Sequence, residues 1–367
     1  MDDDRLRILW VFPPLSPQLQ RVAEKLARHP DISLEVMSPI ELPAPLSQLV
    51  SHTPLTCRHK LDLGAQQRIR GKLRDTRFDI VHAYTSRNLA NVIGACRGVQ
   101  PPPEIVGYRG SINRLRVLDP ANWMTFWHPR VAKIICVCQA TERALIESRI
   151  SDTKVETVWE GCEANSLLPE SDCNRAQFGI PEDAFVVGTV ANMRPVKGVD
   201  LLLRAAQQLA DKRDIYWLLI GDVLDSRIAQ LAADTRIADR VILAGPRQQG
   251  GRFVGLFDVY AAPSRMEGLS MSIMEAMTKQ ACCVVSDVGG NVELIRHERE
   301  GLVVPTEDSA ELARALLRLH DEPSLRKRLA ANAYRRVTTE FTISAWTQRL
   351  VGLYRNVATR PAMRLAS

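Results

Sequence analysis

Short apolar runs alternate with longer amphipathic segments along the first part of the chain. Residues 6–12 (LRILWVF) form an apolar run of strand length, and residues 17–29 space their apolar side chains as an amphipathic helix does. Further apolar runs predict strands at 33–38, 78–84, 104–108 and 132–138, and a helix follows at 141–148. Strands that alternate with helices favour a parallel sheet with crossover helices.

The same alternation restarts after a turn-rich, polar stretch at 155–184, which we interpret as a linker. A strand is predicted at 185–190 (FVVGTV) and a strong helix at 198–211. Later strands are expected at 216–222, 240–245, 258–264, 281–288 and 301–305, before a helical tail. The chain is thus predicted to be an α/β protein with two Rossmann-like domains, 1–165 and 166–345, and a C-terminal helix, 346–367, that packs back on the first domain.

Composition narrows the class of protein further. Of the 367 residues, 46% are hydrophobic and 25% charged, which is ordinary for a globular protein. The apolar runs are far shorter than the roughly 20 residues that span a bilayer, and the acidic start MDDDR does not resemble a signal peptide. A net charge of +6 is too small to indicate nucleic acid as a partner. Eight cysteines without a C-x-x-C pair predict small buried side chains, and we expect a cytoplasmic protein.

Several common chemistries lack their sequence motifs. The first strand is followed by PPLSPQ and not by G-x-G-x-x-G, which weakens a nicotinamide or flavin reading. The chain has no G-x-x-x-x-G-K-[ST], no HExxH and no G-x-S-x-G, which disfavours P-loop kinases, zinc proteases and α/β-hydrolases. No Asp-x-Asp metal clamp occurs beyond the acidic N-terminus. We expect neither a metal nor a cofactor.

Two cations stand between a predicted strand and the helix after it. Arg194 and Lys197 lie in the turn of VGTVANMRPVKGVDLLL, beside the backbone N–H groups that open a helix. This combination favours an anion, because Arg offers a planar fork and Lys a compact charge. The alternative is a pair of solvated turn residues, which we consider less probable for two cations at this position.

Two carboxylates follow a later strand in PSRMEGLSMSIMEAM, residues 263–277. Glu267 is expected on the loop and Glu275 early on a helix that begins near 270–272. A carboxylate is a strong acceptor for sugar or ribose hydroxyls. The alternative is that both acids only favour the helix dipole, by about 0.3–1 kcal/mol each.

At these residues the chain resembles retaining glycosyltransferases of the GT-B fold, specifically glycosyltransferase family 4. Their E-x7-E signature is similar to EGLSMSIMEAM here. The resemblance continues in order through VKGVDLLLRA, LLIGD, DRVILAG, FDVYAAPSRMEG, VSDVGGNVELI and EGLVVPTEDSAELARAL, and it is looser in the N-terminal half. It implies a GT-B architecture, with two Rossmann-like domains that face each other across a cleft.

The resemblance also implies roles for the site residues. Glu275 would bind the ribose of a nucleotide donor and Glu267 hydroxyls of the transferred sugar. Lys197 and Arg194 would stabilise the departing diphosphate. The family often has its arginine five residues before the lysine, where this chain has Asn192, so Lys197 is the firmer of the pair. Backbone groups near the sugar and phosphate would come from Gly268, Leu269, Ser270 and Met271.

The acceptor side is expected in the N-terminal domain. His82 matches a family position, and a structural histidine is the alternative. Arg109 lies in a loop that could meet an anionic acceptor or a donor phosphate, with a surface arginine as the alternative. The basic segment 66–78 could rest on a membrane, although a solvated helix with an ordinary apolar stripe is the better reading.

The resulting hypothesis is a hexosyltransferase that moves a sugar from a nucleoside diphosphate sugar to a glycan or lipid-linked acceptor. It would retain the anomeric configuration without a metal, and it would act in polysaccharide or lipopolysaccharide biosynthesis at the inner face of the cytoplasmic membrane. Two alternatives stay open: a nucleotide-sugar epimerase on the same fold, and a non-catalytic sugar-nucleotide-binding protein.

Overall fold

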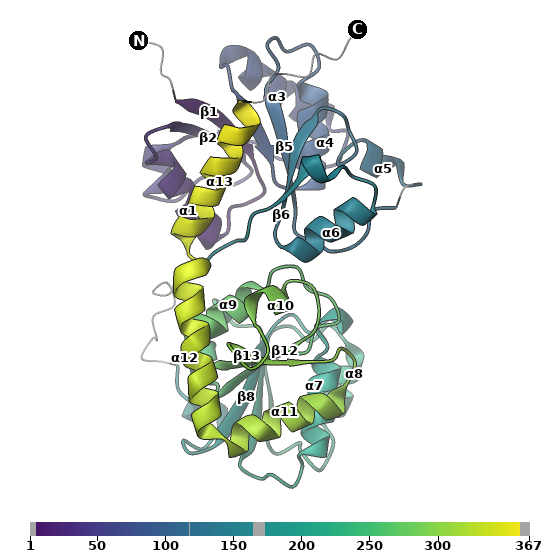
Figure 1. The fold of residues 1–367 in the computed structure, drawn as a ribbon, viewed down its shortest axis with the longest axis vertical. Coiled ribbons are helices and arrows are strands. Elements are labelled where there is room, and N and C mark those ends of the chain that lie inside the picture. The colour runs from purple at the N-terminus through teal and green to yellow at the C-terminus, as the bar shows by residue number, and fades with distance from the viewer. Residues whose placement is uncertain (1–4, 117, 164–172, 360–367) are drawn as a thin grey trace. The chain divides into compact units, whose positions relative to one another are not determined.

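The computed structural model describes residues 5–116, 118–163 and 173–359 and divides the chain into two compact units (Figure 1). Unit 1 consists of Met1–Glu160 and Ile343–Ser367, and unit 2 of Gly161–Thr342. The sequence pattern predicts these divisions at 165/166 and 345/346. Residues 164–172 of the predicted linker and 360–367 of the predicted C-terminal helix lie outside the described residues.

Unit 1 is built on a sheet of seven parallel strands. Across the sheet the strands follow the order β3 (Ser51–Pro54), β2 (Ile32–Ser38), β1 (Leu6–Val11), β4 (Ile80–Ala83), β5 (Glu104–Arg109), β6 (Val131–Cys136) and β7 (Val155–Thr157). The order reverses direction at β1, which lies between β2 and β4. The switch point where such sheets bind ligands therefore lies at the carboxyl ends of β1 and β4.

Helices cover both faces of this sheet. They are α1 (Pro17–Ala27), α2 (Leu46–Leu49), α3 (Leu63–Asp75), α4 (Ser86–Ala95), α5 (Pro120–Trp123), α6 (Gln139–Glu147) and α13 (Ile343–Ala358). One apolar core holds residues of α3 and α4, and a second holds residues of α1 and α13. The late segment α13 thus packs on a sheet whose first strand begins at Leu6.

Unit 2 repeats the design with six parallel strands. Their order is β10 (Val241–Gly245), β9 (Ile215–Ile220), β8 (Phe185–Val190), β11 (Val259–Ala262), β12 (Cys282–Ser286) and β13 (Gly301–Val304). The switch point here lies between β8 and β11. The predicted pair of Rossmann-like α/β domains is therefore confirmed.

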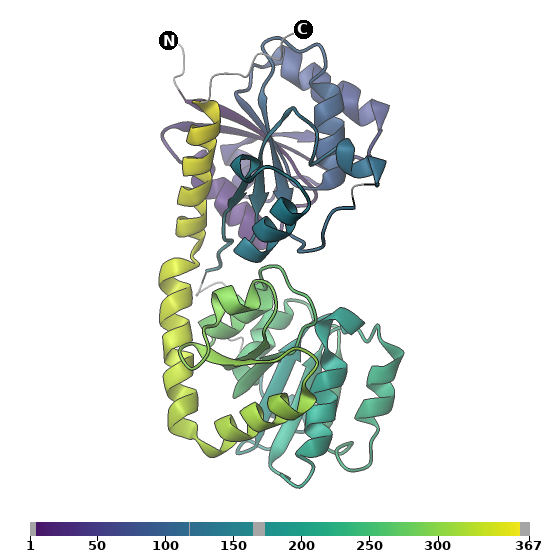
Figure 2. The same cartoon turned by 45° about the vertical axis from the view of Figure 1, so that its right-hand side comes forward.

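The helices of unit 2 are visible from two sides in Figures 1 and 2. They are α7 (Val199–Gln208), α8 (Ser226–Ala232), α9 (Met271–Thr278), α10 (Asn291–Leu294), α11 (Ser309–Asp321) and α12 (Pro323–Glu340), with short 3₁₀ turns at Ala176–Phe178, Pro195–Lys197 and Gly250–Leu256. The main core joins β8, β9, α7 and α11 around Trp217, which is fully buried.

Two local expectations need correction. The linker prediction was wrong at its start, because Val155–Thr157 form β7 and pair with β6. The strand β3 was not predicted, because its residues SHTP form no apolar run. The strand lies at the sheet edge, where its residues are polar or exposed.

The basic segment 66–78 packs as an ordinary amphipathic helix. Its apolar residues Ile69, Leu73 and Phe78 are 0%, 5% and 4% exposed within the core under α3. This apolar stripe is therefore not free to enter a membrane. In the described part of the chain, no helix is both long and apolar enough to cross a bilayer.

Candidate active site

The turn after β8 is pressed against the loop after β11. The short 3₁₀ turn Pro195–Lys197 ends at Gly198, which has a φ of 65° and opens α7. A Cβ atom on Gly198 would stand 1.9 Å from the carbonyl oxygen of Pro263, so only glycine allows this approach. The amide of Arg265 also donates to the carbonyl of Val196 at 2.8 Å. The two loops of the switch point are thereby locked together.

This packing brings Lys197 and Glu267 into direct contact. The Nζ atom of Lys197 lies 2.5 Å from Oε2 of Glu267, and the two side chains are 22% and 16% exposed. The hydroxyl of Ser264 donates to the same Oε2 at 3.4 Å. A charge-assisted bond between partly desolvated groups is stronger than a neutral one. The predicted phosphate-binding lysine and sugar-binding glutamate therefore form an ion pair.

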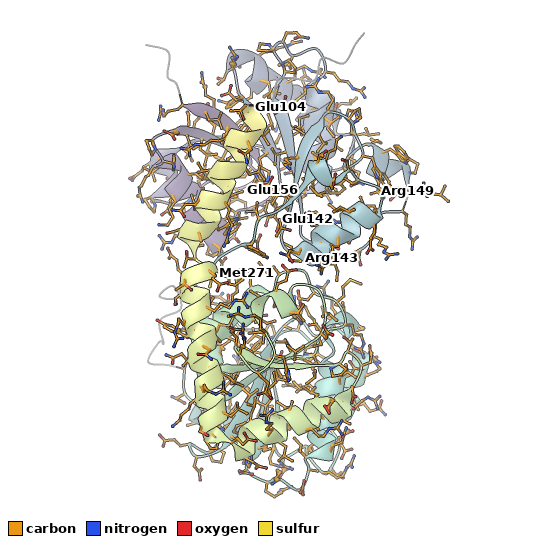
Figure 3. All side chains as sticks on the ribbon, viewed as in Figure 1. Glu104, Glu142, Arg143, Arg149, Glu156 and Met271 are labelled. Atoms are coloured by element: carbon orange, nitrogen blue, oxygen red, sulfur yellow. The ribbon has the colours of Figure 1, made fainter. Side chains whose placement is uncertain are left out.

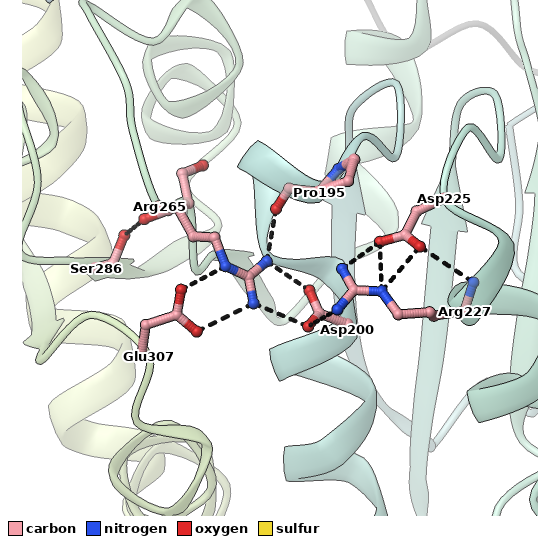
Figure 4. A network of polar contacts seen from close by, with 8 residues as sticks. Pro195, Asp200, Asp225, Arg227, Arg265, Ser286 and Glu307 are labelled. Atoms are coloured by element: carbon pink, nitrogen blue, oxygen red, sulfur yellow. Dashed lines mark hydrogen bonds and ion pairs between the residues drawn. The ribbon is translucent and has the colours of Figure 1, made fainter.

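A network of polar contacts centred on Arg265 holds these two loops in place (Figure 4). Its guanidinium binds both carboxylate oxygens of Asp200, at 2.7 and 2.9 Å, and donates to the carbonyl of Pro195 at 2.5 Å. It also pairs with Glu307 on the loop after β13. Asp200 is only 2% exposed, and a second arginine, Arg227, approaches it to 3.6 Å. The charged neighbours hold the pKa of Asp200 below its usual value despite its burial, because they favour its ionised form.

The helix predicted near 270–272 is α9, which begins at Met271 after the N-cap residue Ser270 (Figure 3). The amides of Gly268, Leu269 and Ser270 donate to no other described residue, and the Ser270 side chain makes no capping bond. The amide of Gly290 donates to the carbonyl of Gly268 at 2.9 Å and holds this loop from the β12 side. Free amides at a helix start favour an anion.

Glu275 lies on α9 with its carboxylate against the backbone of the turn Gly250–Leu256. A Cβ atom on Gly251 would come within 2.5 Å of Oε2 of Glu275. This close packing removes water from the carboxylate, and burial raises its pKa to about 7. The carboxylate accepts no hydrogen bond from another described residue. A partly buried carboxylate with unused acceptor capacity is suited to ligand hydroxyls.

The predicted residues are thus brought together to different degrees. Lys197, Glu267 and the loop Gly268–Met271 cluster at the switch point, with Glu275 further along α9. Arg194 starts the same 3₁₀ turn, but its side chain is exposed and contacts neither Lys197 nor Glu267. Arg265 was not singled out from the sequence, although it stands inside the motif, two residues before Glu267.

His82 belongs to the interior of unit 1. It is 2% exposed, and its Nδ1 lies 2.7 Å from the hydroxyl of Tyr354 on α13. The same hydroxyl accepts a bond from the indole of Trp10 at 3.0 Å. Burial lowers the pKa of His82 to about 3, so its imidazole is neutral. These contacts fit the alternative of a structural histidine, because His82 links α13 to the sheet through Tyr354.

Arg109 serves the loop that follows it. Its guanidinium donates to the carbonyls of Ser111 at 3.1 Å and Asn113 at 2.8 Å, and it lies over the ring of Phe126. Burial lowers the pKa of the guanidinium, although an arginine remains charged. Two donors of Arg109 are therefore used in holding the backbone of the loop that follows β5.

Known families match both parts of the chain. The Glycosyltransferase Family 4 model matches residues 16–165, and the Glycosyl transferases group 1 model matches residues 170–336. Among curated relatives, alpha-D-kanosaminyltransferase of Streptomyces kanamyceticus is 32% identical over 255 residues, which are 66% of this chain and 65% of that protein. An Escherichia coli UDP-Gal:alpha-D-GlcNAc-diphosphoundecaprenol alpha-1,3-galactosyltransferase is 22% identical over 298 residues, covering 77% of this chain and 76% of the relative.

A solved structure agrees with the fold over nearly the whole chain. Anabaena Alr3699/HepE in complex with UDP superposes with a TM-score of 0.76 at 20% identity, over 96% of this chain and 100% of that one. The folds are those of GT-B enzymes. The chain belongs to the family 4 glycosyltransferases of the GT-B fold.

Proposed function

We propose that this protein transfers a sugar from a nucleoside diphosphate sugar to a hydroxyl of a glycan or lipid-linked acceptor, with retention at the anomeric carbon. The observation that carries the proposal is the contact between Lys197 and Glu267 beside the free amides of Gly268–Ser270. The same site therefore offers a cation and backbone donors for phosphate, and a carboxylate for sugar hydroxyls. The solved neighbour that binds UDP supports this choice of donor class.

Donor binding would rearrange the existing ion pair. In the proposed complex, the β-phosphate takes the Lys197 ammonium, and Glu267 is released to accept hydroxyls of the transferred sugar. Glu275 accepts the ribose hydroxyls. Because Arg265 holds the turn through Pro195, Lys197 stays in place during this exchange. The site is preorganised for the charge that appears on the phosphate.

The proposed transfer step needs no resident cofactor. The bond between the anomeric carbon and the β-phosphate oxygen breaks, and its electron pair goes to the phosphate. The acceptor oxygen bonds to the anomeric carbon from the same face, and its proton passes to the departing phosphate. Lys197, Arg194 and the amides at the start of α9 stabilise the new charge. We propose that these donors do so without a metal.

The acceptor is proposed to belong to envelope glycan synthesis on the cytoplasmic side. The support is the E. coli relative, whose name places its acceptor sugar on diphosphoundecaprenol, and a Rhizobium meliloti lipopolysaccharide core glycosyltransferase that is 30% identical over 194 residues. An epimerase would use the same donor and need no acceptor.

A thermal-shift panel of UDP-, GDP- and ADP-sugars tests the donor. One nucleotide class should raise the stability of the full chain, by about 2.7 kcal/mol at a concentration a hundred times its Kd. The shift should persist in EDTA. No response to any sugar nucleotide would overturn the proposal and favour the non-catalytic alternative. Conversion of the donor sugar to its epimer without acceptor, followed by NMR, would favour the epimerase.

A further inference from the structure

A cavity of about 590 Å³ lies within unit 1, at the carboxyl edge of its sheet. Its walls come from the segments that follow β1, β2, β3 and β4. It therefore occupies the switch point of this sheet, where an open parallel fold binds its ligands. None of the residues considered for the acceptor from the sequence, including His82 and Arg109, lines it.

The walls carry charge of one sign. Arg58 and Lys60 come from the loop after β3, and Arg87 from the first turn of α4, with His59 beside them. No aspartate or glutamate stands among the described residues that line the cavity. A hollow lined by one sign of charge focuses the potential and concentrates counter-ions.

Hydrogen bonds hold the loop after β3 and the start of α4 in position. The amide side chain of Asn91 donates to the carbonyl of His59 at 2.7 Å and to that of Arg87 at 3.0 Å, and Asn91 itself is fully buried. The Arg87 guanidinium donates to the carbonyl of Cys57 at 3.3 Å. The loop after β3 and the start of α4 are thereby fixed to each other, so a ligand would meet a site that is already formed.

The acid that follows these cations in the same loop, Asp62, is engaged as a helix cap. The carboxylate of Asp62 accepts from the amide of Arg58 at 2.9 Å and from that of Ala65 at 3.0 Å, where it caps α3. These amides hold the pKa of Asp62 below its usual value, so it stays ionised as a cap. Asp62 itself does not line the cavity, although one of the amides it accepts from belongs to Arg58, which does.

The start of α4 adds to the same field. The ten residues of α4 follow the N-cap Thr85, and its first turn contains no acid. The partial positive charge of a helix start therefore points to the cavity together with the side chains of Arg87 and Ser86.

We propose that this cavity binds a phosphate-bearing group of the acceptor through Arg58, Lys60 and Arg87. The word acceptor rests on the proposed function, whereas anion binding rests on the cavity alone. The phosphate could belong to a lipid headgroup or to a soluble sugar phosphate, which present the same chemistry. In either case the cations select acceptors that carry a phosphate.

Calorimetric titration with inorganic pyrophosphate tests the site. The full chain carrying Lys197→Ala is used, so that binding beside Glu267 is suppressed. Adding Arg58→Gln and Arg87→Gln should weaken the pyrophosphate Kd by about tenfold or more, equivalent to about 1.4 kcal/mol. The control pair Arg68→Gln and Arg74→Gln removes two exposed charges of α3 that do not line the cavity, and it should leave the Kd nearly unchanged.

Equal weakening by both pairs, or no pyrophosphate binding before they are introduced, would overturn the proposal. The thermal midpoint of each unliganded variant reports whether it folds. If the double variant is unfolded, the single variants Arg58→Gln and Arg87→Gln replace it, each with a smaller expected loss.

Two further probes distinguish the sources of the phosphate. Sedimentation with phosphatidylcholine vesicles containing phosphatidic acid, lost on Arg58→Gln/Arg87→Gln, would support a lipid headgroup. Binding of glycerol 3-phosphate with the same sensitivity, without vesicle binding, would support a soluble phosphate. Failure of both probes would contradict a phosphate-bearing acceptor.

The two proposals fail separately. Pyrophosphate binding at the cavity without a response to any sugar nucleotide would leave the anion site standing and remove the donor. A clear response to a sugar nucleotide without pyrophosphate binding at the cavity would support the donor proposal and remove the anion site.

Discussion

The two units place charge differently at the same point of the same kind of sheet. At the switch point of unit 2, the cation Lys197 is matched by Glu267 at 2.5 Å. At the switch point of unit 1, three cations share a cavity and no described acid lines it. Parallel sheets place ligands at this edge whatever their residues, so the side chains on the loops decide which ligand is held.

The two arrangements of charge imply different ways of recognising a ligand. Under the proposed function, the paired site would bind by exchange, because an incoming phosphate would take the lysine while sugar hydroxyls would take the glutamate. An unpaired basic site binds by attraction, which any phosphate can use. Unit 2 should therefore discriminate between sugar nucleotides, and unit 1 should tolerate different groups attached to a phosphate.

The largest effect is expected from Lys197→Ala. Removal of the ammonium leaves the departing phosphate without its cation, and the transfer rate should fall by about 10²–10³, or 3–4 kcal/mol. Radiolabelled sugar transfer measures the rate. Lys327→Ala changes an exposed lysine of α12 and should leave it intact. Wild-type turnover by folded Lys197→Ala protein would refute its role in the paired site.

Arg265→Ala should mainly affect stability. It leaves the buried Asp200 carboxylate without its bidentate partner, and we expect a loss of about 2–4 kcal/mol in the free energy of unfolding. Urea titration measures the loss. Arg213→Ala serves as the control, because its pair with Asp239 is 65% and 50% exposed and should contribute at most about 1 kcal/mol. Similar losses in the two variants would mean that the network does not support the site.

Glu275→Gln should change how stability depends on pH. The folded pKa of Glu275 is about 7, above the unfolded value of 4.5. The folded state therefore holds a proton that the unfolded chain has already released between these pH values, so this group lowers stability as pH rises through that window. The variant should gain about 1–3 kcal/mol over wild type at pH 8 and nearly nothing at pH 4.

Urea titrations at the two pH values measure this gain, and the acidic measurement serves as the control. The same variant should bind its nucleotide less tightly, because a neutral amide is a weaker acceptor than a carboxylate. A gain that is equal at both pH values would show that the burial of Glu275 does not perturb its titration.

Asn91→Ala tests the basic site with a smaller change. It removes two bonds that hold the carbonyls of His59 and Arg87, and we expect a loss of about 1–2 kcal/mol in stability. Pyrophosphate binding should weaken less than in Arg58→Gln/Arg87→Gln, because the charges remain while their positions relax. Asn113→Ala, on an exposed loop, is the control for both measurements. Unchanged binding with lowered stability would limit Asn91 to a structural role.

Much of the fold could be predicted because buried parallel strands leave near-continuous apolar runs, as in IICVC before α6 and FVVGTV at β8. The edge strand β3 was missed, since its SHTP sequence buries little and has no such run. β7 was hidden for a related reason: three residues, Val155–Thr157, are too few to show a pattern inside a polar stretch.

Part of the candidate site could be predicted from short segments of the sequence. Lys197 and Glu267 each stand between a strand and a helix, and Glu275 lies on the helix that follows, so their positions could be placed from short segments. The support of Arg265 could not, because Asp200, Pro195 and Glu307 lie 65, 70 and 42 residues away. The basic cavity was missed similarly, since Arg58 and Arg87 follow different strands. The run RHK before the Asp62 cap was the available signal.

The position of α13 has a consequence for the order in which the chain can fold during synthesis. Unit 2 is contiguous, so it can form as soon as Thr342 has left the ribosome. Unit 1 must wait, since Trp346, Leu350 and Tyr354 fill its core only after every other described strand and helix has been made. Until then the nascent N-terminal sheet exposes an apolar face beside Trp10, which makes it a target for chaperones and an aggregation risk. Loss of the last helix would therefore harm the unit that is made first.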